Sequence, residues 1–227
     1  MMPANLIQLR QLLAEKFPEA RLPLQWPRPA ETCRWPTGIP QIDKPLRGGL
    51  PRGALAEFTA ERKCSGSATL VCEILRHAAR HNEILALVDG NDSLDVAPIE
   101  GRVLSRMLWV RCHRTDEALK AADLLLRDKN LPLVLIDLKL AQERQLRKIP
   151  AALWYRFQRL VEETSAVCMV FTSWPMVSPA QTRIALHSAF SLDALEKDTR
   201  ELLGELRLEV FDRKQAVEAA GVLESSA

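Results

Sequence analysis

Residues 60–69 lie between a predicted strand and a predicted helix, match the pattern of a phosphate-binding loop at one glycine, and lack the side chains that act on a nucleotide. In the working pattern GxxxxGK[ST], the glycines let backbone N–H groups surround the phosphates, the lysine reaches the β and γ phosphates, and the hydroxyl holds magnesium. Gly66 matches the second glycine, whereas Glu61 stands at the first. Ser67 and Ala68 occupy the lysine and hydroxyl positions. Taken alone, these residues would not be identified as a phosphate-binding loop. With the motifs around them, described below, they predict a degenerate loop that does not hydrolyse ATP, and weak binding of ATP is left open.

A second candidate residue, Asp137, lies near the end of an apolar run at 131–138, which is typical of a strand buried on both faces. In an active nucleotide enzyme, an acidic residue at this place holds the water shell of magnesium. Its hydroxyl partner is missing, so we interpret Asp137 as a relic or as a cap on the next loop. The vestigial nucleotide site is expected to comprise Gly66, Ser67, Ala68, Thr69 and Asp137.

Basic residues gather after this run and could contact nucleic acid. Binding to DNA phosphates needs little more than a local density of Lys and Arg. Glutamates are interleaved with the basic residues, so a solvated helix face is the alternative. The candidate nucleic-acid residues are Arg144, Arg147, Lys148 and Arg156.

Two features could bind a protein partner. On the predicted helix at 151–163, Leu153, Phe157 and Leu160 have the spacing of a core-facing stripe. Trp154 then points away from this stripe, so it is a candidate anchor for a partner; packing of Trp154 in the core is the alternative. The helix expected at residues 4–16 has a leucine stripe suited to a groove on a partner or a second copy, or else to its own core. The stripe consists of Leu6, Leu9, Leu12 and Leu13.

Composition argues against several other classes of protein. The net charge of +2 neither demands nor excludes nucleic acid as a partner. The five cysteines form no CxxC pair, and the four histidines have no metal-binding spacing, so we expect buried free thiols and no metal site. No apolar stretch reaches the roughly 18 residues of a membrane helix and no signal peptide is visible, so we expect a cytoplasmic protein.

These candidate residues need a framework to position them. Apolar runs predict strands at 54–59, 83–88, 107–112, 131–138 and 166–172, and helices are expected at 68–80, 115–127 and 151–163, with Thr115 as a candidate N-cap. This alternation is typical of a mostly parallel sheet flanked by helices. Two later strands, at 189–195 and 205–211, are expected to extend the sheet in antiparallel fashion.

We expect three parts along the chain. Residues 1–36 form an N-terminal helix and an irregular arm that contains five prolines, residues 37–212 form the α/β core, and residues 213–227 form a flexible tail.

Several motifs in this order resemble the core of RecA-type proteins. They are the turn at 37–43 (TGIPQID), the turn at 48–53 (GGLPRG), the strand and loop at 86–95 (ALVDGNDSLD), the strand at 133–137 that ends in Asp137, and the strand at 166–173. The resemblance spans about residues 35–212 and implies a RecA-like fold. It also places Asn91 where a glutamate activates the attacking water, and an amide does this poorly.

Among RecA-like proteins, the short length, the proline-rich arm, the degraded loop and the helix containing LWYRFQRL at 153–160 resemble the ImuA family; the cell-division inhibitor SulA has a related fold. This resemblance implies a non-catalytic scaffold in damage-induced translesion DNA synthesis. The implied partners are an ImuB-like inactive Y-family polymerase and a replicative-type polymerase. RecA, a second copy of the chain and single-stranded DNA stay open as further partners. An ATP-binding recombinase-type ATPase and a SulA-like inhibitor are the alternative functions.

Overall fold

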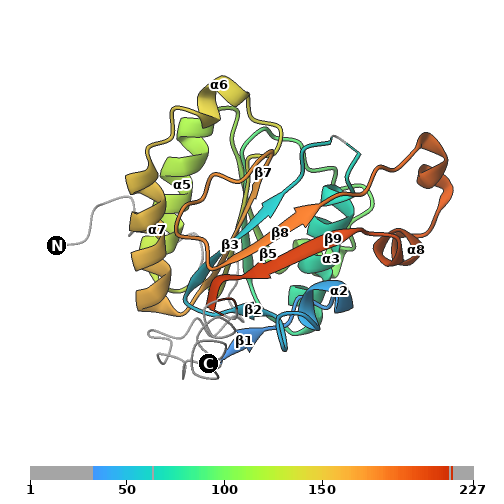
Figure 1. The fold of residues 1–227 in the computed structure, drawn as a ribbon, viewed down its shortest axis with the longest axis horizontal. Helices are drawn as coiled ribbons and strands as arrows, with labels where there is room; N and C mark the ends of the chain where they lie inside the picture. Colours follow the sequence, from blue (N-terminus) through green and yellow to red (C-terminus); the bar gives the residue numbers. More distant parts are fainter. Residues whose placement is uncertain (1–32, 63, 215, 217–227) are drawn as a thin grey trace, which may run out of the picture.

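The computed structural model describes residues 33–62, 64–214 and 216 of the 227-residue chain, and one large sheet dominates it (Figure 1). Its strands are β3 (Ala54–Thr59), β4 (Leu85–Asp89), β5 (Met107–Arg111), β6 (Leu133–Asp137), β7 (Val167–Thr172), β8 (Thr182–Leu186) and β9 (Leu208–Asp212). They lie in the order β5-β4-β6-β7-β3-β8-β9. The first six run parallel, and β9 runs antiparallel to β8. The predicted α/β class with a mostly parallel sheet is confirmed.

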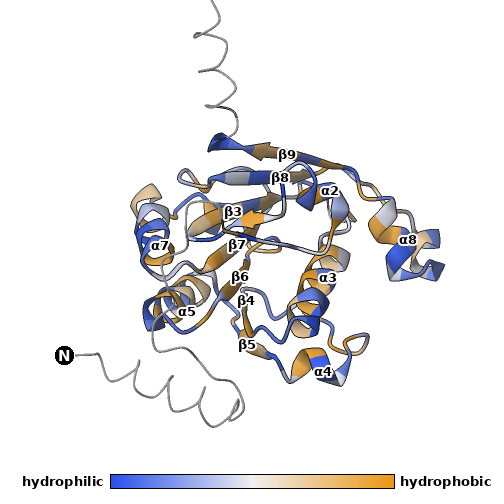
Figure 2. Cartoon of the chain, turned by 90° about the horizontal axis from the view of Figure 1, so that it is seen from below, coloured by the Kyte–Doolittle hydropathy of each residue, from blue (hydrophilic) through white to orange (hydrophobic). Residues whose placement is uncertain are grey.

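Helices cover both faces of this sheet (Figure 2). One face is covered by α5 (Thr115–Asp128) and α7 (Ala151–Thr164), and the other by α3 (Ser67–Arg80) and α4 (Gly101–Leu104). Shorter elements are α2 (Pro40–Asp43), α6 (Glu143–Leu146), a 3-10 turn at Leu192–Glu196, and α8 (Thr199–Gly204). No helix among the described residues is long and apolar enough to cross a membrane.

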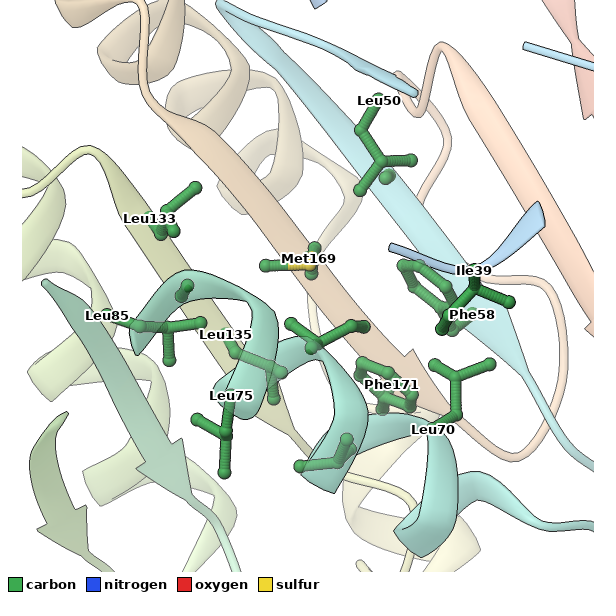
Figure 3. Packing of buried hydrophobic residues seen from close by; sticks show 14 of the residues in the cluster. Ile39, Leu50, Phe58, Leu70, Leu75, Leu85, Leu133, Leu135, Met169 and Phe171 are labelled. Carbon is green, nitrogen blue, oxygen red and sulfur yellow. The ribbon is translucent and has the colours of Figure 1, made fainter. Parts of the chain in front are cut away.

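The core has two halves, one on each side of the sheet, because the central strands are apolar on both faces. On the α3 side, Phe58 stacks on Phe171 with ring centroids 4.6 Å apart, and Leu70 lies beside them (Figure 3). On the α5 and α7 side, Trp154 and Phe157 pack edge to face and are buried.

A two-stranded ribbon stands apart from the large sheet. It pairs β1 (Arg34–Trp35) with β2 (Leu50–Pro51). Trp35 is only 1% exposed, and Arg34 forms an ion pair with Asp212 at the end of β9. The prediction that residues 18–36 have no regular structure is therefore wrong for this last stretch, which joins the core.

Several local predictions are corrected by the structure. No strand forms at 189–195, because Phe190 packs over the phosphate-binding loop and a 3-10 turn follows; the strand lies earlier, as β8. β9 provides the expected antiparallel extension.

Thr115 is the first residue of α5 rather than its N-cap, and its hydroxyl donates to Gln145 Oε1 instead. Two of the cysteines expected to be buried, Cys33 and Cys64, are exposed.

Candidate functional site

The carboxyl ends of the parallel strands converge on the loop predicted to be degenerate. Asp89 of β4 lies opposite Asp137 of β6, and Thr59 of β3 lies opposite Thr172 of β7. Ligands of open parallel sheets bind at this edge, outside the carboxyl ends of the strands. The chain order brings the loop before α3 to the same edge, so the candidate site has contributions from four neighbouring strands.

Gly66 makes the turn from the loop into α3. Its φ of 81° lies in the left-handed region, and it is the N-cap of the helix. Ser67 is the first helical residue and is buried, Ala68 is exposed, and Thr69 is half-buried. The predicted loop residues thus lie together at the N-terminus of a 14-residue helix, the position that binds phosphate in working loops.

Lys139, which follows β6, reaches into this loop from the opposite side. Its Nζ donates to Ser65 Oγ at 2.9 Å and to Ser67 Oγ at 2.7 Å. A lysine ammonium from the turn after β6 therefore contacts Ser67, the residue that the sequence pattern aligns with the missing lysine. Burial lowers the pKa of Lys139, and the nearby Asp137 carboxylate opposes part of this shift.

Asp137 is placed where it caps the loop that carries Lys139. Its Oδ1 accepts a hydrogen bond from the Lys139 backbone N–H at 3.0 Å. Burial raises the pKa of the Asp137 carboxyl; the Asp89 charge adds to the rise, whereas the backbone hydrogen bond opposes it. This geometry favours the cap interpretation of Asp137 over a role toward magnesium.

The acidic residue at the end of β4 has a similar structural role. The Asp89 carboxylate accepts hydrogen bonds from the backbone N–H groups of Ser93, at 2.8 Å, and Leu94, at 2.9 Å. It also accepts from Trp109 Nε1 at 3.3 Å. Asn91, which the sequence resemblance aligns with a catalytic glutamate, is exposed on the turn that Asp89 organises.

A cavity of about 420 Å³ lies beside the loop, between α3 and the turn after β4. Ser67, Thr69 and Cys72 line it from α3, and Asp95 and Lys139 line it from the facing loops. Within the described residues, no group of three histidine, cysteine or acidic side chains could hold a metal ion.

Sequence reasoning missed a buried charge in the central strand. Glu57 of β3 is 0% exposed, and its Oε1 accepts from the backbone N–H groups of Met176, at 2.6 Å, and Val177, at 2.8 Å. Arg183 Nε donates to Oε2 at 3.1 Å. This carboxylate therefore fixes the loop after β7. A lone glutamate inside an otherwise apolar strand was the sequence signal that could have identified it.

The predicted nucleic-acid residues do not form one free basic surface. Arg144, Arg147 and Lys148 are exposed in and just after α6. Arg147, however, pairs with Glu143 and stacks over the Trp174 ring at 5.5 Å. Arg156 pairs with Asp123 on α5.

The proposed partner anchor Trp154 is a core residue. It is 1% exposed, and the residues that share its buried stripe are Phe157, Val161 and Thr164. The core-facing stripe is thus shifted by one residue from the predicted one, because Leu153 and Leu160 are only half-buried. The exposed aromatic residue on this helix is Tyr155, at 54%. Leu6, Leu9, Leu12 and Leu13 lie outside the described residues.

Comparisons with known proteins point to RecA. No family model matches the chain. RecA of Methylococcus capsulatus is 34% identical over 105 residues, which cover 45% of this chain and 30% of that RecA. RecA of Clavibacter michiganensis subsp. michiganensis is also 34% identical over 105 residues, covering 45% of this chain and 29% of that protein. The chain thus spans about 30% of the length of the RecA proteins it matches.

A solved structure shows the same architecture. The RadB recombinase superposes with a TM-score of 0.50 at 13% identity, covering 63% of this chain and 78% of RadB. Together with the sheet order and the loop before α3, this likeness shows that the fold is RecA-like.

Proposed function

We propose that this chain is a non-catalytic, RecA-like accessory protein of the damage-induced DNA tolerance response, acting in translesion synthesis through contacts with other proteins. The partners proposed are an ImuB-like inactive Y-family polymerase and a replicative-type translesion polymerase. The RecA-like fold and the partial sequence similarity to RecA support the broad placement among DNA recombination and repair proteins.

The proposal that the chain does not hydrolyse ATP rests on the residues found at three positions of the candidate nucleotide site. Ser67 and Ala68 stand at the lysine and magnesium-hydroxyl positions, and Asn91 stands at the position of the water-activating glutamate. Losing phosphate charge compensation, or losing the general base, each reduces the rate by orders of magnitude. The structural roles of Asp89 and Asp137 as caps on their own loops fit a site without magnesium chemistry.

An ATPase assay tests this part of the proposal. Purified protein with magnesium and ATP is expected to release phosphate no faster than a buffer control, with or without single-stranded DNA. The matched variant is Asp137→Ala, which should behave as the wild type does. Turnover above the buffer control that is lost in Asp137→Ala would instead support a recombinase-type ATPase, the alternative that the RecA similarity favours.

The accessory role is tested by capture of partners from DNA-damaged cells. Tagged protein should retain an inactive Y-family polymerase relative and a replicative-type polymerase, and mass spectrometry identifies both. Retention of a cell-division protein in their place would support the SulA-like alternative and would contradict the proposal.

A further inference from the structure

The interior of the degenerate loop is already occupied by a side chain of the same protein. Lys139 Nζ lies within hydrogen-bond distance of both Ser65 Oγ and Ser67 Oγ. Ser65 is 0% exposed and Ser67 is 8% exposed, whereas Lys139 is half-buried, so both bonds are partly shielded from solvent. In a working loop the lysine donates its N–H groups to phosphate oxygens, whereas here two of them are directed at loop hydroxyls.

Gly66 in the loop is covered by apolar side chains from the segment between β8 and β9. A Cβ on Gly66 would lie 2.5 Å from Leu206 Cδ2 and 2.7 Å from Phe190 Cε2, so these side chains lie directly against the glycine. The Phe190 backbone N–H also donates to the Cys64 carbonyl at 2.9 Å. The loop is therefore contacted both by Lys139, at Ser65 and Ser67, and by Phe190 with Leu206, at Gly66.

These contacts replace those that a nucleotide normally provides. A phosphate-binding loop gains its closed form by directing backbone N–H groups at an anion. A polyphosphate at this loop would compete with Ser65 and Ser67 for the N–H groups of Lys139, and hydrogen bonds of a charged donor are about twice as strong as neutral ones.

We propose that this chain holds its own degenerate loop in place, with Lys139 hydrogen-bonded to Ser65 and Ser67 and with Phe190 and Leu206 packed against Gly66, so that the RecA-like core keeps one loop arrangement without nucleotide. The loops that carry Lys139 and Phe190 then have fixed positions at the carboxyl edge of the sheet. This inference concerns occupancy of the loop, so it does not depend on the proposed polymerase partners and is tested without them.

Hydrogen exchange measures whether Lys139 holds the loop. In the full-length protein, Lys139→Ala should speed amide exchange in residues 64–69 by about tenfold, because two partly buried hydrogen bonds to the loop are lost while the rest of the sheet is retained. Lys148→Ala, a change of the same type at an exposed lysine nine residues further along, should leave this exchange unchanged. If Lys139→Ala prevents folding, the milder Ser67→Ala should show the same local effect. Unchanged exchange in both variants would overturn the proposal.

Binding of MgATP distinguishes a closed loop from a relocated phosphate-binding lysine. Wild-type protein should show no binding by calorimetry at millimolar MgATP, and Lys139→Ala should bind no more weakly than the wild type. If the wild type binds MgATP and Lys139→Ala weakens that binding tenfold or more, Lys139 serves the nucleotide instead, and the self-closed loop is wrong. ATP hydrolysis and partner capture are separate readouts, so failure of this proposal is distinguishable from failure of the proposed function.

Discussion

Glu57 is a charged residue at the centre of the sheet, and its hydrogen bonds explain why the core tolerates it. Two backbone N–H groups, the Thr172 hydroxyl and the Arg183 guanidinium all donate to one buried carboxylate. A buried charge is costly unless its lone pairs are satisfied. The residue therefore links three elements: β3 that carries it, β8 that carries Arg183, and the loop after β7.

Replacing Glu57 should destabilise the whole domain. Glu57→Ala leaves two buried N–H groups and Arg183 without their acceptor, so the free energy of unfolding should fall by about 3–5 kcal/mol. Urea denaturation measures it. Glu209→Ala, which removes a carboxylate from the exposed edge strand β9, should cost less than about 1 kcal/mol. Equal losses in the two variants would contradict the structural role of Glu57.

The carboxyl of Asp137 predicts a particular pH dependence. Burial raises its pKa in the folded state above the unfolded value. Such a group contributes stability below the unfolded pKa, near 3.9, and this contribution is lost as pH rises through the folded pKa. Asp137→Asn removes this ionisation and keeps an oxygen to accept the Lys139 N–H. The melting temperature of the variant should therefore exceed that of the wild type at pH 7, and the difference between the two should shrink toward pH 4.

An exposed aspartate provides the opposite control. A hydrogen bond from Arg114 lowers the pKa of Asp116. Its contribution is therefore present at neutral pH and is lost as pH falls, so Asp116→Asn should not raise the melting temperature at pH 7. A lower melting temperature for Asp137→Asn than for the wild type at pH 7 would show that the Asp137 charge stabilises the fold.

At the level of elements, the strands with continuous apolar sequence were predictable, whereas the use made of the apolar segment 189–195 was not. The strands β3, β6 and β7 lie within one or two residues of their predicted positions, because strands buried on both faces leave continuous apolar sequence. The segment 189–195 has a similar apolar content, but it forms no strand, and the Phe190 side chain in it packs against Gly66. Whether such an apolar segment forms a strand or packs against a loop depends on its neighbours in the folded structure, which the sequence pattern does not show.

The helix α7 allows a direct test of which aromatic residue it buries. Trp154→Ala should lower the free energy of unfolding by about 3–5 kcal/mol, because it leaves a large cavity in the core half formed with α5. Tyr155→Ala, one residue along the same helix and exposed, should change it by less than about 0.5 kcal/mol. Chemical denaturation of both variants measures the difference. A small loss for Trp154→Ala would restore its role as a surface anchor.

The segment around α6 predicts how any binding to single-stranded DNA depends on salt. Arg144 and Lys148 are exposed, whereas Arg147 and Arg156 already pair with carboxylates. If the first two contact phosphates, Arg144→Ala with Lys148→Ala should reduce the slope of log affinity against log salt by about 1.4, since each contact contributes about 0.7. Fluorescence anisotropy at several salt concentrations measures this slope.

The matched control lies on the other face of the sheet. Arg102→Ala in α4 changes the net charge by one without touching the α6 segment, and it should leave the slope unchanged. An unchanged slope in the Arg144 and Lys148 double variant would identify the segment as an ordinary solvated surface.

For the whole molecule, the chain order of the motifs predicted the sheet edge that assembles the site, but not how the site is filled. Parallel strands direct their carboxyl ends to one edge, so Gly66 and Asp137 were expected near one another. Lys139 was not expected, because its distance from Ser67 in sequence is long and the contact depends on the strand order β6-β7-β3. The one nearby lysine in sequence, Lys63, lies outside the described residues.

The last prediction concerns how the core meets its partners. Within the described residues, Arg34 and Trp35 pair with β2, and the Trp35 side chain is buried, so the chain is joined to the core from this strand onward. The leucines at 6, 9, 12 and 13 have the spacing of a helix that docks in a groove. Deleting residues 1–30 should therefore leave the melting temperature within about 4 °C of the full chain.

The same deletion should abolish self-association, seen by light scattering, or retention of the polymerase partners. A control that keeps the chain length, Leu9→Ala with Leu12→Ala in the full protein, should lose the same contacts, because they depend on the leucine stripe rather than on the arm. A fall of many degrees with assembly intact would show instead that the stripe packs on its own core. The partner surface would then belong to the core itself, and the buried Trp154 could not be its anchor.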